Sequence, residues 1–314
     1  MEWRQSKKNE AKDSRVTIFI VTKNRLYKLR RCLQSIANQK IKAEEVLIID
    51  NDPSESARRV YMEFNEILPV RYLIEIHPGT PFARNLALTN CKTDYGAFVD
   101  DDCVLDEHWM ETGLKAIKNT QHAYVVGKTL LLNDDNIVAQ AQYLLTKKWI
   151  EQSIGKQNEI RNIDTKNVIL KIPLLNKHNL LFDERFFVPP IPAGEDEDLA
   201  MNMDELKLRG YYEEKMNVFH EEINDFWSFM RRAYGQGKSS FLLYKKWRAK
   251  GYFQAMDHLK LLPVILIPLR TPFNVFKEIS GGFCYKFKIF VLVLLFDRAH
   301  LLGFLSQKRK KGAL

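Results

Sequence analysis

The stretch VTIFIVTKNRLYKLRRCLQSIANQKIKAEEVLIID, residues 16–50, predicts a strand, a helix and a second strand. Residues 16–22 are apolar and largely β-branched, which is typical of a buried strand. Residues 24–39 place apolar side chains at a helical period with basic residues between them. Residues 44–50 are again strand-like. Two buried strands joined by a helix predict a parallel β–α–β unit.

The same alternation continues along the chain. Further helical patterns cover 54–64, 80–90 and 106–119, and further strand patterns cover 70–76, 95–100 and 123–132. This order predicts an α/β domain whose doubly wound, mostly parallel sheet is flanked by helices. Residues 133–167 are polar and weakly periodic, and we expect a mobile insertion or rim there. A strand is expected to return within 168–175.

Charge is distributed unevenly over the 314 residues. The formal net charge is +9, but the chain from Phe226 to the end holds 17 Lys and Arg against 3 Asp and Glu, so residues 1–225 carry −5. An acidic body with a basic tail does not fit a nucleic-acid-binding domain, which needs a basic face. The four cysteines are scattered without zinc-ligand spacing, which favours a reducing compartment.

The two ends of the chain differ from its middle. We expect a disordered lead over 1–15, without the apolar core of a signal peptide. The α/β domain is expected over 16–240, and a basic, apolar helical extension over 241–314. No stretch reaches the roughly 20 apolar residues that span a bilayer. The extension therefore predicts interfacial helices on a membrane, with a packed helical subdomain or a dimer face as alternatives. The oligomeric state is left open.

Polar residues follow three of the predicted strands. Thr22 and Asn24 end the first strand, Asp50 and Asp52 the second, and Asp100, Asp101 and Asp102 the one at 95–100. Ligands bind at the carboxyl ends of strands in such sheets, so these groups are expected to share one crevice. Isolated acids often only cap helices. Three adjacent aspartates repel one another unless a cation meets them.

A second acidic cluster opens a predicted helix at 195–210. Pro189, Pro190 and Pro192 predict an extended approach, and Gly194 relaxes the backbone before four acids at residues 195–198. Acids at a helix N-terminus are also favoured by the helix dipole. The spacing by itself therefore leaves a functional and a structural role open.

Together these motifs resemble family 2 glycosyltransferases, inverting enzymes with a GT-A fold that use nucleotide-sugar donors. The similar segments stand in the family's order over residues 16–240: VTIFIVTKNR, LIIDNDPSE, GTPFARNLAL, FVDDDC, FDERFF with AGEDEDL, and VFHEEINDFWSFMRRAYGQG. Lys23 departs from the family, where Tyr is frequent, and Ala87 stands where Gly is frequent.

The resemblance implies a role for each matching residue. Thr22 and Asn24 line the base pocket, Asp50 hydrogen-bonds the pyrimidine of a UDP-sugar, Arg84 faces the donor phosphates, and Asp100 approaches the ribose. Asp102 binds a divalent cation, with His220 as a further ligand, and Asp196 is the general base. Asp52, Asp101 and Glu195 are counted with the substrate-binding residues, and Glu195 is the rival base. Oxygen ligands suit Mg²⁺ or Mn²⁺, and a histidine favours Mn²⁺.

The expected enzyme is a hexosyltransferase that builds polysaccharide at the cytoplasmic face of the membrane, with a glycan or lipid-linked acceptor and no nucleic acid. Two alternatives stay open. One is an inactive family member that acts as a scaffold. The other is a nucleotidyltransferase, although the first strand is not followed by a glycine-rich loop that could hold a triphosphate.

Overall fold

The computed structural model describes residues 15–187, 193–252, 275–277, 279 and 281–311. The chain forms two compact units, each treated by itself below. The first, which we call the sheet unit, comprises residues up to 130, 153–183 and 199–220. The second, the helical unit, comprises 131–152, 184–198 and the chain from 221 onward. The extended segment that is expected at Pro189, Pro190 and Pro192 lies outside the described residues. So does the expected N-terminal lead up to residue 14.

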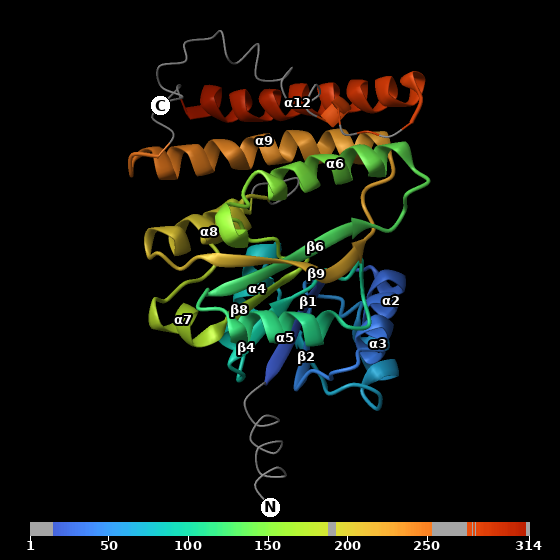
Figure 1. Ribbon diagram of the computed structural model, residues 1–314, viewed down its shortest axis with the longest axis vertical. Helices are drawn as coiled ribbons and strands as arrows, with labels where there is room; N and C mark the ends of the chain where they lie inside the picture. The colour runs from blue at the N-terminus through green and yellow to red at the C-terminus, as the bar shows by residue number, and fades with distance from the viewer. Residues whose placement is uncertain (1–14, 188–192, 253–274, 278, 280, 312–314) are drawn as a thin grey trace, which may run out of the picture. The chain divides into compact units, whose positions relative to one another are not determined.

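One half of the sheet is parallel (Figure 1). Its strands lie in the order β3 (Val70–Ile74), β2 (Glu45–Asp50), β1 (Val16–Thr22) and β4 (Tyr95–Phe98). Register pairs Phe19 with both Leu47 and Phe98, so three strands end at one edge. The helices between them are α2 (Leu26–Ala37), α3 (Arg58–Phe64) and α4 (Thr80–Thr89).

The other half of the sheet adds antiparallel strands. The order continues from β4 through β8 (Val168–Lys171), β6 (Tyr124–Leu131), β9 (Gly210–His220) and β5 (Cys103–Leu105), with β7 (Glu159–Ile160) paired to β9. β8 is antiparallel to β4 and β6, and β9 is antiparallel to β5 and β7. Here lie α5 (Trp109–Asn119), α7 (Ile172–Lys177) and the 3₁₀ turn η1 (Lys156–Asn158). The predicted α/β sheet flanked by helices is confirmed.

The core of the sheet unit forms because α2 and α5 bury one apolar face each. Leu29, Leu33 and Ile36 of α2 are fully or almost fully buried against the strands. Trp109, at the start of α5, is fully buried, and its indole Nε1 donates to Asn167 Oδ1 at 2.7 Å. These contacts hold α2 beside β5 and α5 beside β9.

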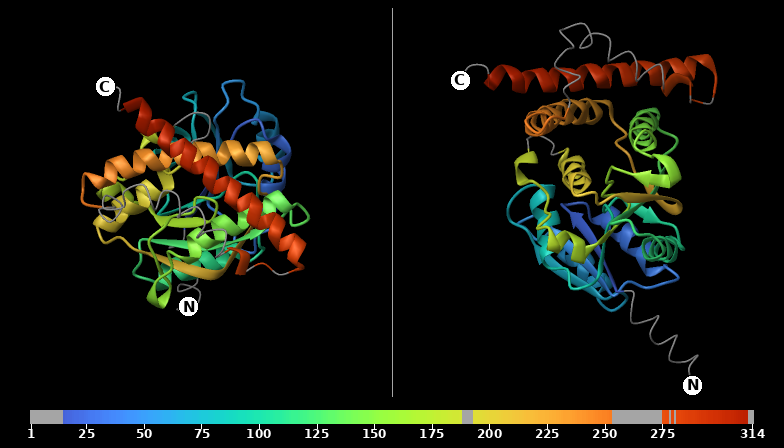
Figure 2. Two further views of the ribbon diagram at one scale, coloured as in Figure 1. Left: turned by 90° about the horizontal axis from the view of Figure 1, so that it is seen from above. Right: turned by 60° about the vertical axis from the view of Figure 1, so that its left-hand side comes forward.

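Three long helices make up most of the helical unit. They are α6 (Ile137–Glu151), α9 (Phe226–Arg248) and α12 (Phe283–Lys311), and Figure 2 shows α12 lying obliquely across α9. The unit also contains the 3₁₀ turn η2 (Glu184–Phe186) and the first turn of α8 (Glu195–Glu205), whose remainder belongs to the sheet unit. The expected domain boundary after residue 240 falls within α9.

Helix α6 corrects the expectation of a mobile rim over 133–167. Asn136 caps it, since its Oδ1 accepts hydrogen bonds from the amides of Val138 and Ala139. Val138 and Ala141 then enter an apolar cluster with residues of α9 and α12. The helix is stabilised by partners far along the chain, which its own weak periodicity does not reveal.

The C-terminal helix corrects a second expectation. Phe283–Gln307 is one continuous helical segment, and an 18-residue window within it has a mean hydropathy of 1.9, so by length and composition it could cross a membrane. Its charged residues are Lys286, Lys288, Asp297 and Arg298, and the last two are adjacent, so an apolar run remains on each side of them. The other apolar stretch of the tail, 259–273, lies outside the described residues.

Candidate functional site

The ends of β1 and β4 meet at a short hydrogen bond. Thr22, the last residue of β1, is buried and donates from Oγ1 to Asp101 Oδ2 at 2.6 Å. Asp101 follows β4 by three residues, and its side chain is fully buried. The parallel register of β1 with both β2 and β4 produces this meeting. Thr22, Asp50 and the three aspartates therefore lie at one edge of the sheet, as the strand pattern predicts.

Arg25 joins two of the three aspartates. Its guanidinium contacts Asp101 through Nη2 at 2.6 Å and Nε at 3.1 Å, and Asp102 Oδ2 through Nη1 at 2.8 Å. Lys28 Nζ lies 3.6 Å from the same Asp102 oxygen. A fork of donors fixes the carboxylates in orientation as well as in charge. The repulsion expected among the aspartates is thus offset by cations of α2 and its N-cap.

The opposite oxygen of Asp102 faces a histidine. Asp102 Oδ1 lies 3.1 Å from His220 Nε2, and both side chains are buried. The antiparallel pairing of β5 and β9 puts Cys103 opposite His220, which brings the imidazole to the residue that precedes Cys103. Asp102, Cys103 and His220 offer ligand atoms within 4.8 Å of one another. The family resemblance implies Asp102 and His220 as metal ligands, and the fold brings these two side chains together.

Burial and neighbouring charges shift the pKa values of these groups in different directions. Burial raises the pKa of Asp101 to about 7, against the lowering effect of Arg25. Burial would also raise the pKa of Asp102, but His220, Arg25 and Lys28 hold it well below its usual range. Burial raises the pKa of the Cys103 thiol. Asp102 is therefore ionised at neutral pH and is a strong candidate ligand, whereas Cys103 stays protonated and is the weaker candidate.

The pair fits a hard divalent cation by its chemistry. A carboxylate oxygen and a neutral imidazole nitrogen are ligands that Mn²⁺ accepts, and Mg²⁺ prefers the oxygen. The thiol of Cys103, which would favour a softer metal, contacts the Lys166 carbonyl instead, at 3.8 Å. The residues present therefore suit Mn²⁺ or Mg²⁺ better than zinc.

Asp50 forms a second polar position at the end of β2. It is fully buried, and its Oδ2 accepts hydrogen bonds from the Tyr72 hydroxyl at 2.6 Å and from the Ala57 amide at 2.8 Å. Its Oδ1 is buried and has no hydrogen-bond partner among the described residues. Burial and the hydrogen bond to the neighbouring Asp50 raise the pKa of Tyr72 well above its usual range, so the hydroxyl remains a donor. A fixed carboxylate with one open acceptor can receive an N–H group of a ligand.

Residues near Asp50 shape the surrounding loop. Asn24 has a positive φ of 52°, and its amide donates to Ser56 Oγ at 3.1 Å. Asp52 Oδ1 accepts from the Ser54 amide at 3.0 Å, and this contact lowers the pKa of Asp52. These contacts join the turn after β1 to the loop after β2. Asn24 and Asp52 thus lie in adjoining loops beside Asp50.

Arg84 and Asp100 form a looser pair. Arg84 Nη2 is 3.8 Å from Asp100 Oδ1, and Asp100 is the most exposed of the three aspartates, at 32% of its side chain. The Arg84 guanidinium also lies 5.5 Å from the centre of the Phe182 ring. The Asn85 side-chain amide donates to the Phe182 carbonyl at 2.9 Å and accepts from the Phe182 backbone amide at 2.8 Å. Phe182, the first residue of the FDERFF segment, therefore fixes the helix that carries Arg84.

The acidic residues in the first turn of α8 differ in burial and in their contacts. Asp198 is fully buried and contacts Lys246 Nζ at 2.7 Å and Trp247 Nε1 at 2.8 Å, which joins α8 to α9. Glu195 is buried, whereas Asp196 is partly exposed. Asp198 is thus a structural member of the turn. Asp196 remains the predicted base, with Glu195 as the rival.

Three residues of this arrangement escaped the sequence analysis. Arg25 looks like one more base of an amphipathic helix, Tyr72 like an ordinary strand aromatic, and Phe182 like a core residue. The position of Arg25, directly after the first strand and its turn, was the available signal. Nothing in the local pattern of Tyr72 or Phe182 reveals their partners.

Comparison with known proteins agrees with this geometry. The sequence model of Glycosyl transferase family 2 matches residues 17–174, and the chain belongs to this family. Glycosyltransferase GlyA of Streptococcus pneumoniae is 22% identical over 271 residues, which cover 85% of this chain and 37% of that protein. The chain spans between 37% and 51% of the length of the first three curated relatives that it matches.

Solved structures share the fold. The mannosyltransferase PcManGT of Pyrobaculum calidifontis, in complex with GDP-Man and Mn²⁺, superposes with a TM-score of 0.63 at 14% identity, covering 95% of this chain and 88% of that one. TarS 1–349 of S. aureus, in complex with UDP-GlcNAc, gives a TM-score of 0.54 at 13% identity, covering 96% and 92%. The expected GT-A-like architecture is therefore present.

Proposed function

We propose that this chain is an inverting glycosyltransferase that moves a sugar from a nucleoside diphosphate sugar to a hydroxyl of a glycan or lipid-linked acceptor. The observation that carries the proposal is the pairing of Asp102 with His220 at the edge of the sheet that also holds Asp50. Family membership and the nucleotide-sugar complexes of the two structural neighbours support it.

The donor is assigned to two positions of the sheet edge. Asp50 would accept a hydrogen bond from the base through its open Oδ1, while Tyr72 and the Ala57 amide hold its other oxygen. Thr22, Asn24 and Asp52 would shape the surrounding pocket. Asp100 would approach the ribose, and Arg84 the phosphates. A UDP-sugar is proposed from the sequence resemblance. The neighbours bind UDP-GlcNAc and GDP-Man.

Asp102 and His220 would hold a divalent cation, Mn²⁺ or Mg²⁺. When bound, the cation neutralises the charge that develops on the diphosphate leaving group. Arg25 and Lys28 keep Asp102 ionised and directed toward His220. Asp101, enclosed by Thr22 and Arg25, is assigned a positioning role in this arrangement. Asp196 would take the proton of the acceptor hydroxyl in the single displacement that inverts the sugar carbon.

One pair of variants tests this assignment. Asp102→Asn should lose Mn²⁺ binding, measured by calorimetry, together with donor binding and nucleoside diphosphate release. Asp196→Asn should retain donor binding, while kcat falls by about 10²–10⁴. Asp135→Asn, the same change at an exposed loop position, is the matched control.

The donor is identified by thermal stabilisation with a panel of UDP- and GDP-sugars, with and without Mn²⁺, since a ligand of the folded state raises its stability. Turnover by Asp102→Asn equal to that of the unmodified protein would exclude the metal assignment. A protein that binds donors but never releases a nucleoside diphosphate would be a scaffold.

A further inference from the structure

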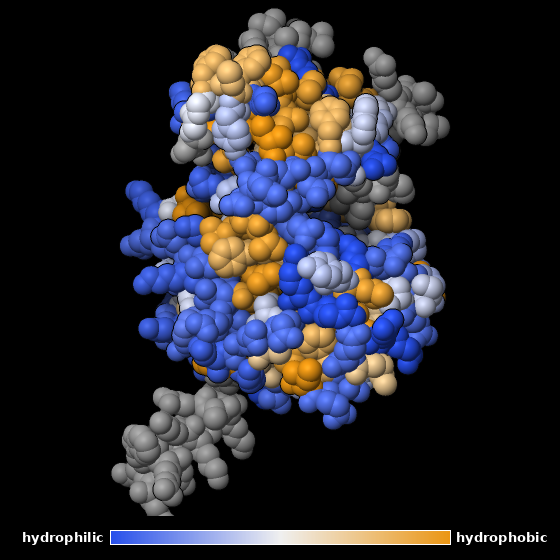
Figure 3. Space-filling view, turned by 90° about the vertical axis from the view of Figure 1, so that its right-hand side faces the viewer, coloured by the Kyte–Doolittle hydropathy of each residue, from blue (hydrophilic) through white to orange (hydrophobic). Residues whose placement is uncertain are grey.

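Helix α12 exposes a broad apolar face. Four of its large apolar side chains have 40–73% of their surface exposed: Phe283, Phe287, Leu295 and Leu302. At 100° per residue these four lie within about 120° of the helix circumference. Figure 3 shows hydrophobic side chains gathered over the helix at the top of the view. An exposed apolar face of this kind marks a site of interaction with a membrane or with another protein.

The opposite face of α12 is buried by packing within the helical unit. Ile289, Val293 and Phe296 are buried in the cluster with α6 and α9. The closest approach to α9 occurs at two glycines, because a Cβ on Gly303 would collide with the Tyr234 carbonyl and one on Gly237 with the His300 carbonyl. Helix α12 is therefore packed against α9 where the two cross, and among the described residues its outer face is left exposed.

This attachment disfavours a spanning orientation. A transmembrane α12 would draw α9 into the hydrocarbon with it, and α9 carries Arg231, Arg232 and Lys238 beside its contacts with α12. Each such charge costs several kcal/mol at the centre of a bilayer. Arg298 lies on the exposed face itself, where its charged end can reach the headgroups only if the helix lies in the interface.

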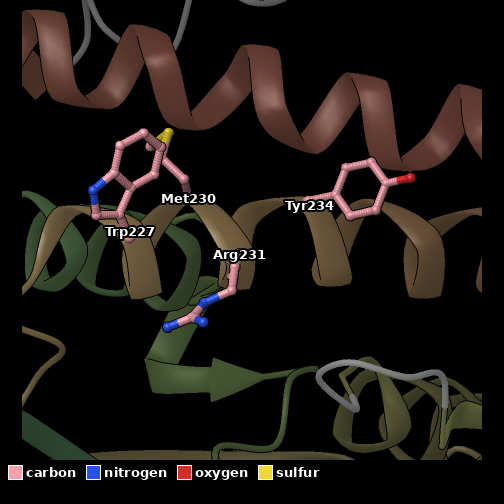
Figure 4. A pocket seen from close by; sticks show the side chains of 4 residues that line it. All are labelled: Trp227, Met230, Arg231 and Tyr234. Atoms are coloured by element: carbon pink, nitrogen blue, oxygen red, sulfur yellow. The ribbon is translucent and has the colours of Figure 1, made fainter.

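Charge and aromatic content indicate what covers the face. The chain from Phe226 onward carries 17 basic against 3 acidic residues. On α9, Trp227 is 73% exposed and lines a pocket of ≈ 440 Å³ with Met230, Arg231 and Tyr234. Figure 4 shows Arg231 pointing away from α12, and Trp227 beside it on α9. Arg231 therefore does not serve the outer face of α12, but the exposed Lys288 and Arg298 of α12 itself lie beside and within the arc of its exposed apolar side chains. Apolar residues interleaved with basic groups are the composition of a helix at an anionic lipid surface.

We propose that α12 lies in the plane of an anionic lipid bilayer, with the face of Phe283, Phe287, Leu295 and Leu302 at the boundary between headgroups and acyl chains. The occupant of the face is lipid, and basic residues of the tail contact the lipid phosphates. This inference does not depend on the proposed sugar transfer.

The test uses the full chain and vesicles of phosphatidylcholine with and without phosphatidylglycerol. The variant Phe287→Glu/Leu302→Glu alters the proposed face, and Met62→Glu/Ile67→Glu is the control. The control residues are 59% and 61% exposed, compared with 52% and 62% on α12, and both variants add the same charge. The partition coefficient on anionic vesicles should fall at least about tenfold for the α12 variant. It should change less than about threefold for the control, whose charges lie outside α12 and are screened by salt.

A second measurement reports the depth of α12. Cys284 is exposed at the start of the helix, while Cys32 and Cys103 are buried, so a polarity-sensitive dye can be placed there in a Cys91→Ser background. We expect a blue shift on anionic vesicles and release of the protein by alkaline carbonate. Resistance to carbonate would mean that α12 spans the bilayer. Absence of vesicle binding, equal losses in both variants, or a dimer that only the α12 variant disrupts would each overturn the proposal.

Discussion

Arg25 shows how one side chain can set the state of an acidic site. It contacts Asp101 twice and Asp102 once, on the side of Asp102 that faces away from His220. Removing one partner of a buried charge pair leaves the other partner uncompensated. The oxygen that we propose faces a metal is Oδ1, which Arg25 does not contact, so Arg25 and a cation at Asp102 would not compete for one atom.

We therefore expect Arg25→Met to lower the melting temperature without metal, and Mn²⁺ to restore more of it than in the unmodified protein. The reason is that a cation relieves repulsion that Arg25 otherwise offsets. Differential scanning fluorimetry with a Mn²⁺ titration measures both effects. Arg59→Met, at an arginine that is 84% exposed, should leave both values unchanged. An equal Mn²⁺ shift in all three proteins would contradict this role for Arg25.

The acidic turn of α8 makes a prediction about pH. Burial, with the charges of Asp196 and Asp198, raises the pKa of Glu197 from 4.5 to about 7. An acid whose pKa is raised in the folded state destabilises the fold when it is ionised. The contribution of Glu197 to the free energy of unfolding therefore declines as pH rises from about 4.5 to 7, and it is constant above pH 7.

Glu197→Gln should therefore raise the melting temperature at pH 8 and leave it nearly unchanged at pH 4.5. For a chain of this size, each kcal/mol corresponds to roughly 2–4 °C. Thermal unfolding of both proteins across this pH range measures the difference. Glu205→Gln, at the other end of the same helix, is the control. A gain that is independent of pH would show that burial of the charge is not the cause.

At the scale of elements, the crossing of α9 and α12 depends on two glycines. Gly303→Val would push a side chain against the Tyr234 backbone, which cannot move without shifting α9. We expect a loss of about 1–3 kcal/mol, as for other overpacked positions. Urea unfolding measures it, and Gly282→Val is the control because a Cβ there meets nothing within 4 Å. Equal stability of the two variants would mean that the helices do not pack as described.

Elements also show which parts of the fold the sequence could predict. The parallel half was predictable because each strand is a short β-branched run followed by an amphipathic helix, as residues 16–50 illustrate. The antiparallel half was not, since the pairing of β5 with β9 joins Cys103 to a partner that nothing nearby specifies. Helix α6 was missed because its apolar face is narrow, and packing with α9 and α12 completes it.

At the scale of the whole molecule, some residues of the candidate site could be predicted from the sequence and others could not. The strand-end acids were predictable from position, since parallel strands present their carboxyl ends at one edge. His220 was named only through the family resemblance, and its place depends on strand register. Arg25 and Tyr72 were missed because a single sequence does not specify which distant carboxylate a cation or hydroxyl will contact.

The register of β5 and β9 also has a consequence for protein synthesis. As the chain leaves the ribosome, Asp102 emerges long before His220, so a nascent chain has one of the two proposed metal ligands without the other. Arg25 and Lys28 have by then been made, and they can neutralise the aspartates from the outset. An unfinished or prematurely terminated chain thus has a charge-compensated edge that does not require a metal ion, and the proposed ion site is complete only when β9 pairs with β5.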